Sequence, residues 1–140
     1  MTFRYLPDIA LADIAFEAES DTVGGVFESC GLALTDIMVN PKTLRAKASR
    51  DFTLGPADLD RLLYDFLTEL IIAKDVDSLL FKEFSVQVDA KRGTLKATGK
   101  GEAIDRERHE LRNDVKAVTM HMFGVKNEGG AWRATVVLDI

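Results

Sequence analysis

The sequence has one cysteine, two histidines and no long apolar run, and each scarcity narrows what the protein can be. Cys30 cannot form an internal disulfide, so a reducing cytoplasm is the compartment that we expect. No apolar run approaches the roughly 18 residues of a membrane span. The first eight residues lack the apolar core and cleavage site of a secretory signal. We therefore expect a cytoplasmic protein that contacts no membrane.

The short motifs of common catalytic and cofactor-binding sites are also missing. The sequence contains no C-x-x-C, H-E-x-x-H, P-loop or G-x-G-x-x-G pattern. Acidic residues outnumber basic ones and give a net charge of −5, so the chain lacks the basic surface expected of an autonomous nucleic-acid binder. Any role near RNA would then depend on a partner protein.

The residues that are present predict one globular domain spanning 1–140. An apolar fraction of 46% and a charged fraction of 29% are typical of a folded, soluble chain long enough to bury a core. Apolar residues recur every three or four positions in two segments, which predicts two α-helices. The first carries its apolar stripe from 23 to 38, with Ser20 or Asp21 as its cap, and the second begins at Pro56 and carries its stripe from 59 to 71. Alternating or apolar segments predict strands at 14–19, 44–52, 79–88, 95–101, 115–123 and 132–140.

This order of elements, β-α-β-α-β-β-β-β, predicts an α+β fold, with two helices packed on a mainly antiparallel β-sheet or sandwich. Two details bear on its interior. Cys30 lies on the apolar stripe of the first helix, which indicates a buried, inert thiol. Gly99 and Gly101 remove side chains from one side of their strand, so we expect close packing there, for example by a helix.

The last predicted strand ends in two carboxylates, the side chain of Asp139 and the α-carboxylate of Ile140. Charges at the rim of a folded core need water, a basic group, a hydrogen-bond donor or a bound cation. Asp13 stands at the start of the first predicted strand. If the first and last strands are neighbours, these hard oxygen donors converge, and Ca²⁺ or Mg²⁺ prefers such ligands. Spacing alone leaves open that they are ordinary solvated carboxylates.

Several segments, taken in order, resemble the archease family. They are A-D-I at 12–14, L-L-Y-D-F-L at 62–67, G-E-A-I-D at 101–105, K-A-V-T-M-H at 116–121 and D-I at 139–140. Four positions depart from the family pattern. Ala10 and Leu11 stand where the family has His-Thr, Phe66 stands where it has Trp, and Met120 stands where it has Tyr.

The resemblance implies a cytoplasmic protein that activates an RtcB-type RNA ligase in tRNA splicing and RNA repair and is not itself an enzyme. It implies that the protein promotes guanylylation of the ligase's active-site histidine, allows multiple turnover and meets RNA only through the ligase. It further implies a divalent metal site, best suited to calcium, at Asp13, Asp139 and Ile140. Ala10 and Leu11 would weaken or alter that site.

Three other residues, His109, Lys116 and His121, are candidates for partner contact or an accessory role. Two alternative functions stay open. In the first, the protein is an independent enzyme in which His109 or His121 acts as a general acid or base beside Glu102 or Asp105. In the second, it is a chaperone-like assembly module that recognises protein surfaces.

Overall fold

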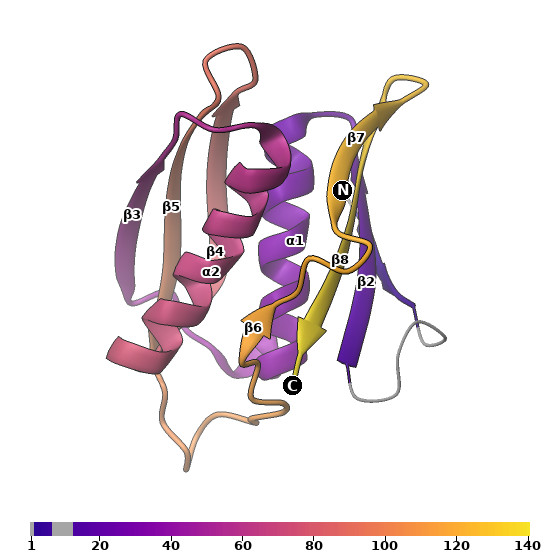
Figure 1. Cartoon of the computed structure of the whole chain (residues 1–140). Helices are drawn as coiled ribbons and strands as arrows, with labels where there is room; N and C mark the ends of the chain where they lie inside the picture. Colours follow the sequence, from indigo (N-terminus) through magenta and orange to yellow (C-terminus); the bar gives the residue numbers. More distant parts are fainter. Residues whose placement is uncertain (1, 7–12) are drawn as a thin grey trace.

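Two antiparallel β-sheets face each other with two α-helices between them (Figure 1). This computed structural model describes residues 2–6 and 13–140. The elements, in chain order, are β1 (Thr2–Tyr5), β2 (Asp13–Ser20), α1 (Val23–Met38), the 3-10 helix η1 (Pro41–Thr43), β3 (Ala48–Leu54), α2 (Leu59–Asp77), β4 (Leu79–Asp89), β5 (Thr94–Ala103), β6 (Ala117–Val118), β7 (Gly124–Glu128) and β8 (Ala131–Asp139).

The larger sheet has the strand order β1-β2-β8-β6, and β7 also pairs with β8. One side of β8 therefore contacts β2, while β6 and β7 share the other side. The smaller sheet has the order β3-β5-β4. All strand pairs are antiparallel. The predicted α+β class, with two helices and a mainly antiparallel sandwich, is confirmed.

Both helices begin at side chains that cap their first turns. The Thr22 hydroxyl accepts a hydrogen bond from the backbone N–H of Gly25 at 3.0 Å, and the Asp58 carboxylate accepts one from Arg61 at 2.8 Å. Such caps satisfy backbone donors that have no partner inside the helix. Both predicted helices form, but the cap of α1 is Thr22 and not Ser20 or Asp21, and α2 begins at Leu59, after the cap Asp58, and not at Pro56.

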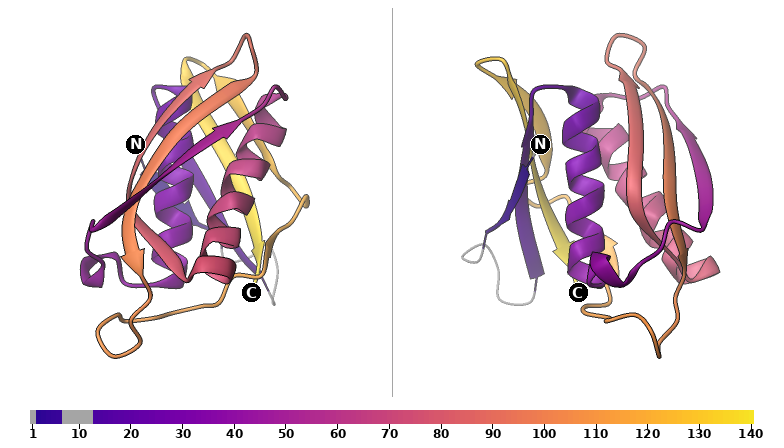
Figure 2. Two further views of the ribbon diagram at one scale, coloured as in Figure 1. Left: turned by 90° about the vertical axis from the view of Figure 1, so that its left-hand side faces the viewer. Right: turned by 180° about the vertical axis from the view of Figure 1, so that it is seen from behind.

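The free edge of β4 is covered by α1, which runs between the sheets (Figure 2). The Glu28 carboxylate accepts a hydrogen bond from the backbone N–H of Val86 at 2.9 Å. Seven residues further along α1, the buried Thr35 hydroxyl donates to the carbonyl of Phe81 at 2.7 Å. These bonds pair backbone groups that an open sheet edge would leave unsatisfied.

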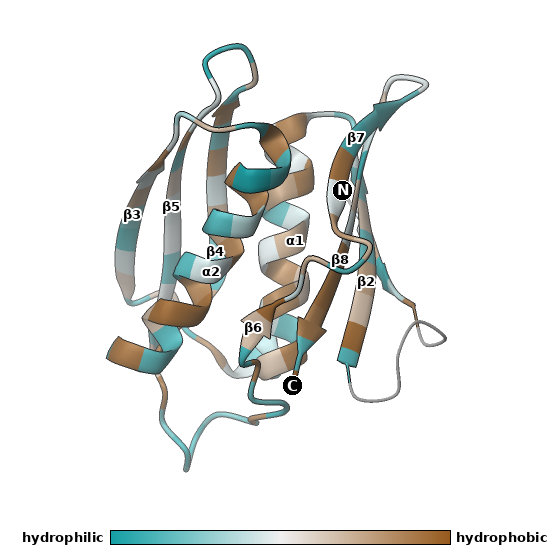
Figure 3. Ribbon diagram, in the orientation of Figure 1, coloured by the Kyte–Doolittle hydropathy of each residue, from teal (hydrophilic) through white to brown (hydrophobic). Residues whose placement is uncertain are grey.

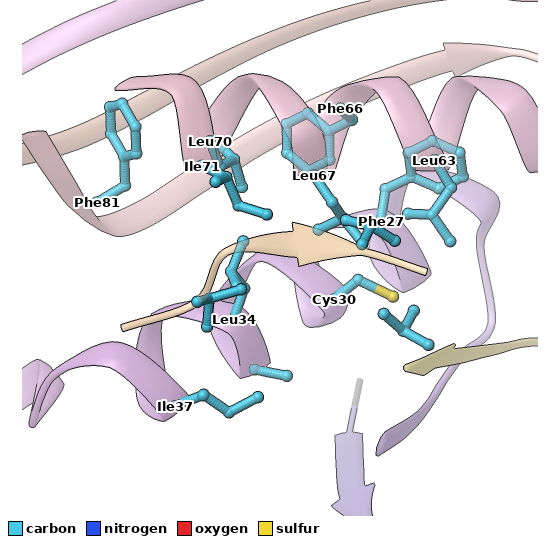
Figure 4. Packing of buried hydrophobic residues seen from close by; sticks show 14 of the residues in the cluster. Phe27, Cys30, Leu34, Ile37, Leu63, Phe66, Leu67, Leu70, Ile71 and Phe81 are labelled. Carbon is cyan, nitrogen blue, oxygen red and sulfur yellow. The ribbon is translucent and has the colours of Figure 1, made fainter. Parts of the chain in front are cut away.

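The core lies where the helices meet the inner faces of both sheets. Phe66 is fully buried and contacts the rings of Phe27, Phe52 and Phe84 at centroid distances of 6.3, 6.2 and 5.9 Å. Figure 4 shows Cys30 of α1 among these apolar side chains, and burial raises the pKa of its thiol. The expectation that Cys30 is buried is confirmed. Apolar colouring also runs along β8 (Figure 3).

Three expectations about the strands are wrong. The prediction omitted β1 and placed the start of β3 at 44 instead of 48. It also joined 115–123 into one strand, whereas only 117–118 and 124 onward are strands. The intervening segment turns at Met122, which has a φ of 53°. Among the described residues, no helix combines the length and apolar character needed to cross a bilayer.

The close packing predicted at Gly99 and Gly101 is present, but a neighbouring strand and not a helix provides it. A Cβ atom at Gly99 would lie 2.6 Å from the ring of Phe81. A Cβ atom at Gly101 would lie 1.8 Å from the carbonyl oxygen of Leu80. Both neighbours belong to β4, whose register against β5 shifts between Phe81 and Glu83. A β-carbon at either position would overlap an atom of β4, so these two positions of β5 require glycine.

Candidate metal centre at one end of the larger sheet

Asp13, the first residue of β2, is the direct antiparallel partner of Asp139, the last residue of β8. Directly opposed residues of antiparallel strands project to the same face, with Cβ atoms about 4.5–5.5 Å apart. The two aspartates therefore meet at the end of the sheet where the last strand stops. The conditional expectation that the first long strand and the last strand are neighbours is met.

These two aspartates lie on the outer face of the sheet, away from the helices. Alternation along β2 and β8 directs Phe16, Val136 and Leu138 into the core and the aspartates to the other side. Ile140 has the same parity as Leu138, and its side chain packs against the core. That apolar contact fixes the end of the strand, so the carboxylate groups beyond it are held near the sheet.

Other carboxylates on the outer face have basic partners. Arg4 lies 3.3 Å from Glu17, and Arg133 lies 3.4 Å from Glu19. Over residues 2–6 and 13–140, by contrast, Asp13 and Asp139 form no ion pair. In sequence, residues 7–12 contain no basic side chain and add one carboxylate, that of Asp8. Like charges placed directly opposite each other destabilise a sheet, so this pair suits a bound cation.

The donor set fits a hard divalent ion better than a transition metal. All the available atoms are carboxylate oxygens, which Ca²⁺ and Mg²⁺ prefer. Asp13 also lines a cavity of about 390 Å³, but its other walls include Asp36 and Ile37 of α1, so it lies toward the helix side of the sheet and not on the outer face that carries the aspartate pair. Within the described part of the chain, no group of three or more His, Cys, Asp or Glu residues is arranged to hold a metal. The predicted set has only two such residues, and the terminal carboxylate of Ile140 would be the third.

The short strand β6 reaches Asp139 because α2 holds the segment that precedes it. Lys74 of α2 is buried, and its ammonium group donates to the carbonyl of Val115 at 2.8 Å and also pairs with Asp114. The next residue, Lys116, donates its backbone N–H to the carbonyl of Asp139 at 2.8 Å. The side chain of Lys116 is exposed. The backbone of Lys116 thus adjoins Asp139, and an accessory role for its side chain stays a prediction.

His109, a candidate for partner contact, is buried and so does not offer its side chain to a partner. Its side chain is fully buried. Its Nδ1 accepts a hydrogen bond from the backbone N–H of Asp105 at 2.9 Å, so the ring proton is on Nε2, which donates to Glu102 at 2.7 Å. Both ring nitrogens are therefore engaged inside the protein. This arrangement fits a structural role better than proton transfer to a substrate.

Glu102 is the centre of this buried cluster. Its carboxylate accepts hydrogen bonds from the Arg108 guanidinium at 2.7 Å and from the backbone N–H of Arg45 at 2.9 Å, in addition to the one from His109. The bond from Arg108 is the main reason that the pKa of Glu102 is lowered to about 2, against the effect of burial, which raises it. The cluster joins β5 to the loop after η1 and to the loop before β6.

We expect Glu102→Gln to change how stability depends on pH. Because the folded-state pKa lies below the ordinary value of 4.5, the carboxylate stabilises the protein fully above pH 4.5 and loses that effect as the pH falls toward 2. The free energy of unfolding should be lower for the variant at neutral pH, and the two curves should converge in acid. Urea unfolding from pH 2 to 7 measures both. Exposed Glu107→Gln provides the matched control, and a constant gap for Glu102→Gln would contradict the assignment.

His121 is exposed, but it lies in a turn and not within the strand predicted over 115–123. Its neighbours Met120 and Met122 are 63% and 54% exposed. Of the strand predicted over 115–123, only residues 117–118 form a strand. The turn follows β6 directly, so His121 remains a candidate for partner contact, although it is not part of the aspartate pair.

The four departures from the archease pattern lie in three places. Ala10 and Leu11, close to Asp13 in sequence, lie outside the described residues. Phe66 is a core residue, and its ring packs against three other phenylalanines. Met120 is exposed in the turn after β6.

Comparison with known proteins gives consistent results over almost the full sequence. The model of the Archease protein family (MTH1598/TM1083) matches residues 3–140. Proteins named archease from Pyrococcus furiosus and Methanothermobacter thermautotrophicus are each 38% identical to this chain, over 132 and 131 residues. Each alignment covers 92% of this chain and 93% of the relative.

Two solved structures have the same fold. The solution structure of protein 1598 of Methanobacterium thermoautotrophicum superposes with a TM-score of 0.85 at 35% identity, covering 99% of this chain and 98% of that one. A crystal structure from Thermotoga maritima, described as an archease and possible chaperone, superposes with a TM-score of 0.66 and covers 96% of each chain. Its identity of 15% supports the fold alone.

Proposed function

The chain belongs to the archease family, and on that premise we propose that it is a protein activator of an RtcB-type RNA ligase. In this role it promotes guanylylation of the ligase's active-site histidine and allows multiple turnover in tRNA splicing or RNA repair. It meets RNA only through the ligase, and it works in the cytoplasm. The observation that carries the proposal is the direct pairing of Asp13 with Asp139 at one end of the larger sheet, where both are partly exposed.

The acidic end would act through a divalent cation, and calcium suits it best. Asp13, Asp139 and the terminal carboxylate of Ile140 would hold the ion, since these groups are hard oxygen donors with no basic partner among residues 2–6 and 13–140. A bound ion supplies positive charge, which can stabilise negative charge developing on a phosphate. The chain's own contribution is to place these carboxylates at the rim of a rigid sheet.

Two features favour an activator over an independent enzyme. His109, one of the two histidines, is enclosed and uses both ring nitrogens in hydrogen bonds to Asp105 and Glu102. His121 is exposed in a turn, apart from that cluster. A general acid or base must come within hydrogen-bond reach of its substrate. His109 does lie beside Glu102 and Asp105, as the enzyme alternative requires, but it is enclosed there, and His121 lies apart from both carboxylates, so this geometry favours neither histidine as a general acid or base.

The proposal is tested with the purified protein, the RtcB-type ligase of the same organism, GTP, Mn²⁺ and broken RNA. Guanylylated ligase and joined RNA per ligase molecule are measured as functions of time. We expect the intact protein to increase the yield of guanylylated ligase and to raise turnover above one per ligase. The ligase alone is the baseline, and the same protein after irreversible heat denaturation controls for added mass. Absence of stimulation by the folded protein would contradict the proposal.

A chaperone-like function is the second candidate, because two large apolar side chains, Met120 and Met122, are exposed in one turn. Methionines are common on surfaces that bind several partners. This function predicts that the protein suppresses aggregation of unrelated heat-denatured clients, which light scattering detects. A single ligase client with no effect on the others would favour the activator.

A further inference from the structure

Thr119 has a buried hydroxyl group that makes no hydrogen bond within residues 2–6 and 13–140. The backbone of Thr119 is paired with β8, because its N–H donates a hydrogen bond to the carbonyl of Val137 at 2.9 Å. A buried hydroxyl without a partner loses its hydration and gains nothing in return. Such groups are rare in folded proteins, and each calls for an explanation, one of which is a bound ion or water.

The pairing of β6 with β8 places this hydroxyl on the same face as the aspartate pair. Ala117 is the partner of Asp139, and Val118 is the partner of Leu138. One step further, the hydrogen bond to Val137 continues the register. Side chains alternate along a strand, so Thr119 projects to the side of Asp139 and not to the core side of Leu138.

Thr119 is then the diagonal neighbour of Asp139 across the strand pair. Diagonal neighbours on one face have Cα atoms about 7–8 Å apart, a gap that two polar side chains can close around an ion or a water. Val137, which lies directly opposite Thr119 and on the same face as Asp139, is fully buried and its side chain offers no polar atom. Thr119 has two diagonal neighbours on this face of β8, Asp139 and Thr135, and Asp139 is the one that offers a carboxylate.

A hydroxyl oxygen is also the kind of donor that the aspartate pair lacks. Calcium takes about six to eight oxygen ligands, neutral ones included. Asp13, Asp139 and the Ile140 terminus would supply only negatively charged oxygens, which repel one another. A neutral oxygen adds a ligand, or orients a water bound to the ion, without adding repulsion. A bound cation would therefore provide a partner both for the Thr119 hydroxyl and for the two carboxylates, which have none among the described residues.

We propose that Thr119 is a further member of the cation site and contributes its Oγ1 to the bound ion or to a water on that ion. The proposal rests on the metal-binding part of the proposed function and extends it by one residue and one strand. It makes the site a product of β2, β8 and β6. In this arrangement the two-residue strand β6 positions a neutral ligand near Asp139.

The test is calcium titration by calorimetry of Thr119→Val and Thr119→Ser in the otherwise intact protein. Valine keeps the branched shape and lacks the hydroxyl, so calcium affinity should fall about tenfold or more, as for other residues that support metal ligands. Serine keeps the hydroxyl and should bind as the wild type does. Thermal unfolding in EDTA gives the second readout. There Thr119→Val should unfold at the same or a higher temperature, because it removes an unpaired buried hydroxyl.

Ser29→Ala is the matched control, because Ser29 also has a buried hydroxyl without a hydrogen bond to the described residues, but it belongs to α1 and not to the larger sheet. It should leave calcium affinity unchanged. Equal affinity of wild type and Thr119→Val would overturn the proposal while leaving ligase activation intact. No calcium binding by the wild type would overturn both this proposal and the metal site. Stimulation of the ligase, measured separately, decides the proposed function whatever the titration shows.

Discussion

Asp139→Asn is expected to make the metal-free protein more stable and the calcium-loaded protein less active as an activator. Removing one of two directly opposed carboxylates relieves a repulsion, so the free energy of unfolding in EDTA should rise by up to about 1 kcal/mol. Wild type with calcium at a hundred times its Kd should gain about 2.7 kcal/mol, and the variant should gain almost none. Ligase stimulation at limiting calcium should fall at least about tenfold.

Asp51→Asn is the matched control for this change. Asp51 lies on the outer face of the smaller sheet, where its carboxylate accepts a hydrogen bond from Thr98 at 2.7 Å. The substitution alters net charge by the same amount at a distance from the aspartate pair. It should leave calcium stabilisation and ligase stimulation unchanged. If Asp139→Asn stimulates the ligase as well as wild type, the acidic end has no part in activation.

The second large effect is expected at Gly101, where alanine should lower the free energy of unfolding by about 3 kcal/mol or more. The added Cβ atom would lie 1.8 Å from the carbonyl oxygen of Leu80, far inside van der Waals contact. The obstacle is backbone, so no side-chain rotation can relieve it. One strand of the β4–β5 pair has to move, and the buried residues on that strand move with it. Urea unfolding monitored by circular dichroism measures the loss.

Gly124→Ala isolates steric conflict from the general effect of replacing a strand glycine. The nearest atom to a Cβ at Gly124 is a carboxylate oxygen of Asp60, at 3.8 Å, an ordinary contact. We expect a change within about 0.5 kcal/mol there. If the loss of stability at Gly101 is no greater than at Gly124, the prediction is wrong, and β4 can shift at little cost in free energy where its register against β5 changes.

Periodicity was sufficient to predict the two helices and the buried last strand, since those elements bury one face each and carry the pattern that burial requires. The relation of Asp13 to Asp139 could be stated only as a condition. Two strands at opposite ends of a sequence have no spacing signal that relates them, and their register depends on the turns and packing of everything between. The resemblance to a family pointed to these residues, and the geometry gave them a shared face.

The interior polar cluster could not be predicted, because its sequence looks like a solvated loop. His109 stands among charged residues, and alternation or composition gives no sign that it is buried. Its burial depends on Glu102, which faces it from the end of β5, and on Arg108 beside it. An isolated acidic residue directly after the glycine pair of β5 was the available signal, and it is a weak one.

The split of segment 115–123 was missed for a different reason. A turn in which a non-glycine residue takes a positive φ leaves no mark on the pattern of apolar residues. Met122 adopts such a conformation, and Phe123 beyond it packs against Tyr64 at a centroid distance of 5.9 Å. The packing of that ring against α2 fixes the turn, so tertiary contact and not local preference decides where the strand stops.

The central place of β8 in the larger sheet also governs how the protein is made. β8 is last in chain order, yet it lies between β2, among the first strands, and β6 and β7. A chain emerging from the ribosome can pair β1 with β2 and assemble the smaller sheet early, but β2 keeps an open edge until β8 arrives. Contacts between such distant segments form slowly. The aspartate pair therefore comes into being only with the final docking step of folding.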